Sequence, residues 1–196
     1  MNTARISTPP RHRAAPVLAA LAAALAVLAL AGPGAGPAAA AICPRADATP
    51  DLISPSDARK TLTCLVNNER ADRDKRRLDP DLKLKRVAQK HTEAMIRKDC
   101  LRHECPGEDD LEKRLRRAGY IPQEGSWRFA ESIGFARTPR GMVETWLDGQ
   151  FNRRAMLDGR YRDIGVGVVR GDPKPHNDCN QGCYTYTAIY AFRNPR

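Results

Sequence analysis

The chain contains four histidines, and imidazole is the side chain best suited to acid–base or ligand chemistry near neutral pH. His12 belongs to the N-terminal segment discussed below, and His176 is expected to be solvated in a polar loop. His91 falls on the apolar face of an expected helix, where a hydrogen-bonded structural role is the simpler interpretation. His103 stands in Arg102-His103-Glu104-Cys105-Pro106, beside a cysteine and a proline that would hold it in place. A fixed position is what a ligand or general base requires, so His103 is the leading candidate.

No nucleophile accompanies these histidines in a recognisable pattern. The chain has neither a G-x-S-x-G elbow nor an H-E-x-x-H motif, and no cysteine is clearly spare. Asp109 and Asp110 are adjacent acids, but at the start of an expected helix they are better explained as capping residues. Two histidines and two cysteines lie within residues 91–105, yet their spacing matches no CxxC zinc pattern. A zinc site built on thiolates is therefore disfavoured.

The first 41 residues have the composition of a secretory signal peptide. Residues 1–13 are basic and contain no acid, residues 14–31 are uncharged and mainly Ala, Leu and Val, and residues 38–41 are all alanine. A membrane anchor is the alternative, but the apolar stretch is short, rich in alanine and interrupted by Pro16. A lipid anchor on Cys43 is disfavoured because Ile42 precedes it.

We therefore expect residues 1–41 to be removed, which leaves a secreted, extracellular protein with no membrane anchor. The remaining chain is divided into an N-terminal lead-in at 42–53 and one domain at 54–196. All six cysteines lie in this part, and an even number in an exported chain predicts disulfides. Close spacing favours the pairs Cys100–Cys105 and Cys179–Cys183, which would leave Cys43 to join Cys64.

The charge balance is basic. The signal segment carries three of the 33 Lys and Arg residues and none of the 23 acids, so the exported chain keeps a net charge of +7. Most of this charge sits in mixed helical runs, which a helix normally presents to water. An anionic cell-envelope polymer bound by Arg116, Arg117, Arg153 and Arg154 is a second interpretation. A nucleic-acid partner is not expected.

Helical patterns occupy most of the chain before residue 160, and the clearest strands come after it. Helices are expected from Ser54 to about Lys75, from Asp79-Pro80 through the next apolar stripe, over 109–118, after Thr138-Pro139 and over 152–157. Strands are expected at 164–168 and 184–192, and residues 127–133 are read as extended. This order predicts an α+β domain with an antiparallel sheet, and the chain lacks the Gly-rich phosphate loop of a nucleotide-binding parallel sheet.

A series of short motifs follows the order of a known family. The series comprises Leu65-Val66-Asn67-Asn68-Glu69-Arg70, Leu78-Asp79-Pro80-Asp81-Leu82, Ala88-Gln89-Lys90-His91, His103-Glu104-Cys105-Pro106-Gly107, Ala130-Glu131-Ser132-Ile133 and Asp163-Ile164-Gly165-Val166-Gly167-Val168. With these motifs the chain resembles the CAP superfamily (cysteine-rich secretory proteins, antigen 5, pathogenesis-related 1), also called SCP-like, in its bacterial form. The resemblance implies a three-layer α-β-α sandwich with a central antiparallel sheet.

The resemblance also implies a cleft built around a His/Glu/His set, sometimes with a second Glu, that can bind a divalent ion such as zinc. His103 matches the first histidine and Glu131 matches the glutamate, although the asparagine after that glutamate is Ser132 here. The second histidine falls on Asn152, and amides are poor zinc ligands beside imidazole. Glu144 is near in sequence, but the family motif does not match there.

These observations favour a non-enzymatic extracellular binding module that uses a polar cleft around His103, Glu131 and Asn152. Its ligand would be a lipid, a glycan or a protein. The alternative is a metal-assisted hydrolase acting on cell-wall or protein substrates, with zinc held by His103 and Glu131. The absent second histidine and the missing nucleophile favour binding over catalysis, and a fold by itself does not decide a function.

Overall fold

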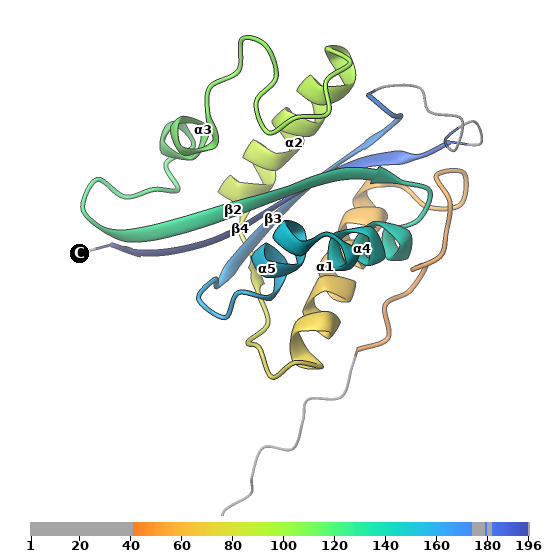
Figure 1. Ribbon diagram of the computed structural model, residues 1–196, viewed down its shortest axis with the longest axis horizontal. Coiled ribbons are helices and arrows are strands. Elements are labelled where there is room, and N and C mark those ends of the chain that lie inside the picture. The colour runs from red at the N-terminus through yellow and green to blue at the C-terminus, as the bar shows by residue number, and fades with distance from the viewer. Residues whose placement is uncertain (1–40, 174–178, 180–181, 196) are drawn as a thin grey trace, which may run out of the picture. The chain divides into compact units, whose positions relative to one another are not determined.

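The computed structural model describes residues 41–173, 179 and 182–195, so the expected signal peptide, His12 and His176 lie outside it. Its helices and strands follow one another along the chain as shown in Figure 1. They are α1 (Pro55–Ala71), β1 (Asp79–Pro80), α2 (Leu82–Arg97), α3 (Leu111–Arg117), β2 (Gly125–Ala136), α4 (Pro139–Asp148), α5 (Gln150–Leu157), β3 (Asp163–Arg170) and β4 (Tyr184–Pro195).

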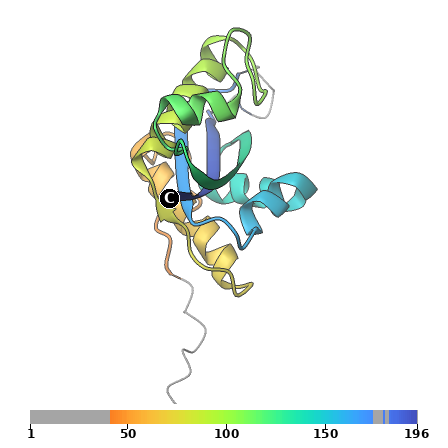
Figure 2. The same ribbon diagram turned by 90° about the vertical axis from the view of Figure 1, so that its left-hand side faces the viewer.

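The strands form one sheet in the order β1-β3-β4-β2. The two long ladders, β2 with β4 and β3 with β4, are antiparallel, and only the two-residue β1 pairs in parallel with β3. Helices α1 and α4 share an apolar core with one face of the sheet, and α2 and α3 cover the other face. Figure 2, which looks along the layers, shows helices on both sides of the strands. The expected α-β-α sandwich is confirmed.

Alternation along β4 explains why both faces of the sheet are covered. Tyr184, Tyr186 and Tyr190 point into the core shared with α1 and α4, whereas Thr187 and Ile189 point toward α2. Successive side chains of a strand project to opposite faces, so a strand that is apolar on both faces needs a helical layer on each.

Two glycines of β3 allow α2 to pack directly on the sheet. A Cβ atom at Gly165 would lie 2.2 Å from the carbonyl carbon of Leu84, and one at Gly167 would lie 2.4 Å from the carbonyl oxygen of Ala88. Such distances are far inside van der Waals contact, so any larger residue would push the helix away. The alternation of glycine with Ile164, Val166 and Val168 thus gives β3 one face for side chains and one for a helix backbone.

The expectation that Asp79-Pro80 begins a helix is wrong. Both residues are extended and pair with β3, and the backbone N–H of Asp79 donates to the carbonyl of Arg162. The helix begins at Leu82, where the Asp81 carboxylate accepts hydrogen bonds from two free backbone N–H groups of the first turn. A residue before proline is held extended, and an aspartate is a good N-cap, so these two local preferences shift the start.

The three disulfides join Cys43 to Cys64, Cys100 to Cys105 and Cys179 to Cys183, which confirms the connectivity expected from the spacing. They leave no free cysteine among the described residues, so no thiolate is present there to bind zinc. Within the same part of the chain, no helix is both long enough and apolar enough to cross a membrane.

Candidate functional site

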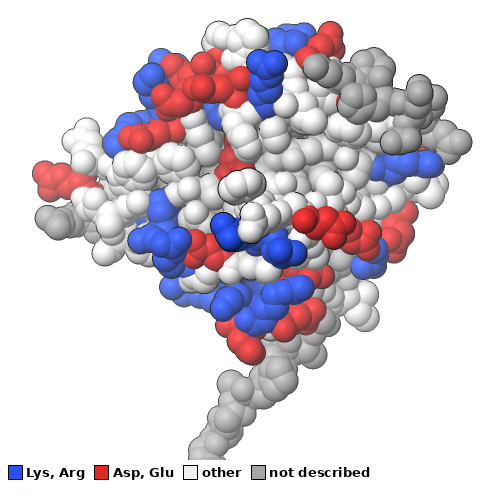
Figure 3. Space-filling view, viewed as in Figure 1, with Lys and Arg blue, Asp and Glu red and all other residues white. Residues whose placement is uncertain are grey.

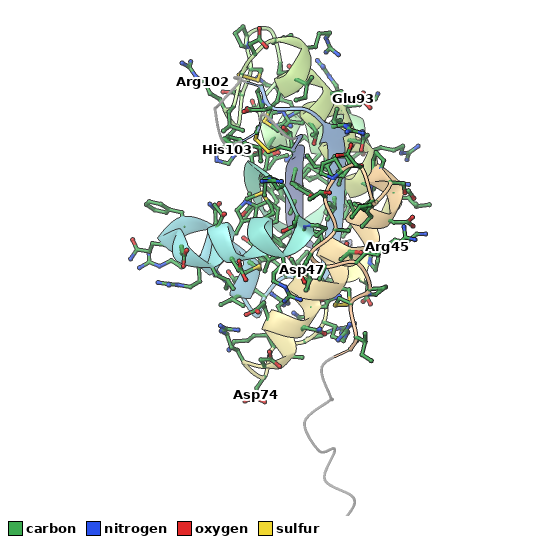
Figure 4. The ribbon with its side chains drawn as sticks, turned by 90° about the vertical axis from the view of Figure 1, so that its right-hand side faces the viewer. Arg45, Asp47, Asp74, Glu93, Arg102 and His103 are labelled. Atoms are coloured by element: carbon green, nitrogen blue, oxygen red, sulfur yellow. A yellow bond between two sulfur atoms is a disulfide. The ribbon has the colours of Figure 1, made fainter. Side chains whose placement is uncertain are left out.

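The loop between α2 and α3 holds His103 in a small covalent ring. The Cys100–Cys105 disulfide closes a ring over residues 100–105, and the Arg114 guanidinium donates from Nη2 to the carbonyl oxygen of His103 at 2.8 Å. Figure 4 shows His103 and Arg102 together on this loop, at the opposite end of the ribbon from Asp74. The backbone of His103 is therefore fixed from two directions, as the sequence context suggests.

The imidazole of His103 pairs with a buried carboxylate. Nδ1 of His103 lies 2.9 Å from Oε1 of Glu131 on β2. The Glu131 side chain is only 2% exposed, whereas that of His103 is 64% exposed. The pKa of His103 is raised above its ordinary value, first because Glu131 accepts its hydrogen bond and then because of the negative charge of Glu131. Burial and the positive charge of Arg114 oppose this rise.

Arg114 of α3 is the second cation at Glu131. Its Nη1 lies 3.5 Å from Oε2 of Glu131, so each carboxylate oxygen faces a different donor. The Arg114 side chain is 11% exposed, which is unusual for arginine. A charged residue in a mixed helical run is expected to be solvated. Arg114, however, lies three residues after Leu111 and four before Ala118, and this spacing places it on the same inward face of α3.

A second histidine lies behind the first. His91 of α2 is fully buried, and its Nδ1 lies 2.9 Å from Oε2 of Glu108, which confirms the expected hydrogen-bonded histidine. Its Nε2 lies 3.8 Å from Oε1 of Glu131 and makes no hydrogen bond to any described residue. Carboxylates and imidazoles therefore alternate in one row, Glu108, His91, Glu131 and His103, whose two middle members are the most buried.

A shallow recess opens beside His103, with a volume of about 330 Å³. Four polar and three apolar side chains line it, namely His103, Glu104, Asp110, Glu131, Leu111, Phe129 and Ala130. The imidazole offers a cationic donor, the carboxylates offer acceptors, and Phe129 offers an aromatic surface. This combination can bind a polar ligand, and it includes no serine, threonine or cysteine that could act as a nucleophile.

The remaining residues of the expected cleft do not join this recess. Asn152 lies on α5 with its amide against the backbone of Gly149, and no hydrogen bond links it to His103 or Glu131. Ser132 is buried on the opposite face of β2 from Glu131. Glu144 is exposed on α4, which packs against that opposite face. Among the matched positions, a hydrogen bond joins His103 to Glu131, and Asn152 is not among the residues that line the recess.

The described residues do not fit a zinc ion. Protein zinc sites use three or four donor atoms, and no group of three His, Cys, Asp or Glu side chains in the described part of the chain is arranged to hold a metal. His103 and Glu131 face each other at 2.9 Å as hydrogen-bonding partners, and Arg114 is the further neighbour where a third ligand would be required.

Comparison with solved structures finds the same fold in bacterial proteins. The chain matches an extracellular SCP-domain protein of Bacillus anthracis (TM-score 0.56, 19% identity, covering 70% of this chain and 43% of that one). It matches an outer surface protein of Borrelia burgdorferi (0.59, 15%, covering 72% and 97%) and a cysteine-rich secretory protein of Staphylococcus aureus (0.51, 15%, covering 70% and 39%). The chain thus spans less than half of the Bacillus and Staphylococcus chains. At these identities the likeness concerns the fold.

A search of curated protein sequences finds no significant match. The family model described as CAP, the cysteine-rich secretory protein family, matches residues 64–190, which is more than half of the chain. This range includes the disulfide-closed loop, the buried carboxylate on β2 and the long strands of the sheet. The chain therefore belongs to the CAP family of cysteine-rich secretory proteins.

Proposed function

We propose that this protein is a secreted, extracellular binding module that takes a lipid, glycan or protein ligand in the recess beside His103, without catalysing a reaction. The observation that carries the proposal is the state of Glu131. Its carboxylate is buried, and its two oxygens face His103 and Arg114. A carboxylate engaged in this way positions the imidazole, and each of its oxygens already faces a nitrogen donor of the protein.

Export is supported by three independent features. The first 41 residues have the composition of a cleaved signal, the cysteines form disulfides that suit an oxidising compartment, and two of the structural neighbours are described as an extracellular and an outer surface protein. The removal of residues 1–41 and the absence of a membrane anchor afterwards are part of this proposal.

The anionic-polymer partner receives less support from the surface. Arg116 pairs with Glu112 at 2.8 Å and lies over the ring of Trp127, and Arg117 pairs with Asp109. On the face shown in Figure 3, basic and acidic side chains are interspersed and do not form a field of one sign. A polymer held by dispersed charge alone would dissociate as salt rises.

One observation keeps a hydrolase as the second candidate. An imidazole oriented by a carboxylate is the arrangement that many general bases use, and His103 and Glu131 adopt it at 2.9 Å. Such an enzyme would activate water directly, since the described residues offer neither a nucleophile in the recess nor a metal site.

Zinc titration and ring resonances of His103 distinguish the two candidates. On the exported chain with its disulfides intact, calorimetry at pH 7.5 should show no saturable zinc binding at micromolar concentrations. In NMR, soluble peptidoglycan fragments, phosphatidylglycerol vesicles and a mixed peptide library serve as probes. One of them should shift the His103 resonance saturably, be released unchanged, and lose its affinity for the His103→Ala variant.

Glu112→Gln is the control matched to Glu131→Gln, because it removes the same charge from α3. Among the described residues, Glu112 pairs with Arg116 and not with His103 or Arg114. This control variant should bind the probe as the wild type does. Cleavage of a probe that disappears with His103→Ala would replace the binding module by a hydrolase. Micromolar zinc binding that disappears with Glu131→Gln would show that Glu131 can hold a metal and would remove the observation on which the binding module rests.

A further inference from the structure

A second pocket lies on the other side of Arg114, between α2, α3 and the loop that joins them. Figures 1 and 2 show α3 beside α2. The pocket has a volume of about 500 Å³, and four basic side chains line it, namely Arg86, Lys90, Arg114 and Arg117. Its two acids are Glu108 and Asp109. The recess beside His103 includes none of these residues.

The two acids already have partners. Glu108 accepts hydrogen bonds from His91 and from the backbone N–H of Cys105, and Asp109 pairs with Arg117. The charge of Glu108 is therefore engaged by His91 and the Cys105 backbone, and the charge of Asp109 is engaged by Arg117. Arg114 faces Glu131, so the positive charges of Arg86 and Lys90 are left to be balanced.

Arg86 and Lys90 carry the unbalanced charge. They lie four residues apart on α2, so their side chains occupy the same face of the helix. Both are exposed, and neither forms an ion pair or a hydrogen bond with any residue that the structure describes. Like charges at this spacing repel each other, and an anion bound between them would remove that repulsion.

Arg114 adds a third cation at the inner wall. One of its Nη atoms faces Glu131, the other donates to the His103 carbonyl, and its Nε–H is buried without an acceptor among the described residues. Guanidinium groups bind phosphate oxygens through paired N–H donors, and lysine contributes a point charge. The volume exceeds that of a phosphate ion, and Val87 and Ala118 supply apolar surface for a carbon skeleton.

We propose that this pocket binds the phosphate group of a phosphate ester through Arg86, Lys90 and Arg114. The ester is the group that a soluble sugar or glycerol phosphate shares with an anionic phospholipid. The proposal does not depend on the ligand of the recess, because the two pockets are lined by different residues. They are adjacent through Arg114, however, so occupancy of one should be detectable at the other.

The test uses the exported chain and three phosphate probes in calorimetry, namely inorganic phosphate, glycerol phosphate and phosphatidylglycerol vesicles. Each is compared with sodium chloride at equal ionic strength. Arg86→Ala/Lys90→Ala should weaken phosphate-probe binding about tenfold or more, because charge-assisted hydrogen bonds are lost. Lys85→Ala/Arg97→Ala is the matched control, since it removes one Lys and one Arg from the same helix outside the pocket. This control variant should change the affinity for the phosphate probes less than about twofold, because salt screens charges that lie far from the pocket.

The three probes distinguish the sources of the ester. Binding of glycerol phosphate in solution indicates a soluble ligand, and binding of vesicles alone, with the same dependence on Arg86 and Lys90, indicates a lipid headgroup. Equal weakening by both double variants, or equal heat from chloride, would show general charge attraction and overturn the proposal. A further readout is the pKa of His103, which the charge of Arg114 lowers. A bound phosphate should offset that charge and raise this pKa in wild type, with no change in the Arg86→Ala/Lys90→Ala variant.

Discussion

Replacing Glu131 by glutamine removes the negative charge at the centre of the site and preserves the shape of the side chain. The hydrogen bond to the exposed His103 is charge-assisted, and after allowance for solvent screening it should contribute about 1 kcal/mol. Arg114 would remain almost buried without its anion, although its bond to the His103 carbonyl persists, which should cost about 2 kcal/mol more. The expected loss of unfolding free energy is therefore about 3 kcal/mol at low pH.

The pH dependence separates the two contributions. The pKa of His103 is raised in the folded protein above its ordinary 6.5, so the stabilisation from its charged form is complete below pH 6.5. That stabilisation is lost as the pH rises through the folded-state pKa, and only the Arg114 part of the loss should remain above it. The cost of Glu131→Gln should thus fall from about 3 kcal/mol at pH 5.5 to about 2 kcal/mol at pH 9.

Urea unfolding followed by tryptophan fluorescence, with the disulfides intact, measures these free energies at both pH values. An NMR titration of the imidazole should show a lower pKa for His103 in the variant than in the wild type. Glu104→Gln serves as control, because it removes a neighbouring exposed charge that has no hydrogen bond to His103. An identical titration of His103 in wild type and Glu131→Gln would refute the assigned pairing.

Three further predictions concern the scaffold of the site. Gly167→Ala should destabilise the fold by about 1–3 kcal/mol in urea unfolding, since its Cβ would meet the α2 backbone, whereas Gly159→Ala, which meets only a lysine side chain, should change little. Asn67→Ala should cost about 2–4 kcal/mol in the same assay, because a buried backbone N–H and C=O lose their partner. Removal of the Cys100–Cys105 disulfide by double serine substitution should speed hydrogen exchange in the loop carrying His103; unchanged exchange would show that Arg114 alone fixes it.

Much of the architecture was predictable because it depends on local signals. Ser54 and Thr138 cap their helices as expected, with Pro55 and Pro139 in the first turn. The second helix was placed too early because the extended pairing of Asp79-Pro80 depends on β3, which lies more than 80 residues further along the chain. A contact between such distant segments leaves no trace in the local pattern of residue types.

The motifs that carried the family resemblance turn out to hold the fold together in large part. The Asn67 side chain accepts a hydrogen bond from the backbone N–H of Leu78 and donates one to the carbonyl oxygen of Leu78. These two bonds fix the chain before β1. Arg70 is fully buried and donates to the carbonyls of Arg76, Met156 and Asp158, so it ties α1 to the end of α5. These two residues explain why motif order predicts the sandwich well, and why the same motifs say little about a ligand.

Site residues could be predicted from the sequence only where neighbouring residues or a family motif marked them. His103 was identified from the cysteine and proline beside it, and Glu131 from the resemblance. Arg114 was missed because arginine in a charged helix is normally solvated, and only its spacing from Leu111 and Ala118 shows that it turns inward. The inward position of Arg114 makes sense only once Glu131 is known to lie buried beside it, and that contact is seen only in the folded structure.

Arg114 also explains how a buried carboxylate is tolerated beside His103. A carboxylate that is 2% exposed must be protonated or face a positive charge, since burial of an unpaired anion is costly. In a site with a bound metal, the ion would supply that charge. Here Arg114 lies 3.5 Å from Oε2 of Glu131 and supplies it from within the protein. A permanently charged guanidinium at this position makes a second, mobile cation unfavourable, which supports the proposal that Glu131 orients His103 without a metal.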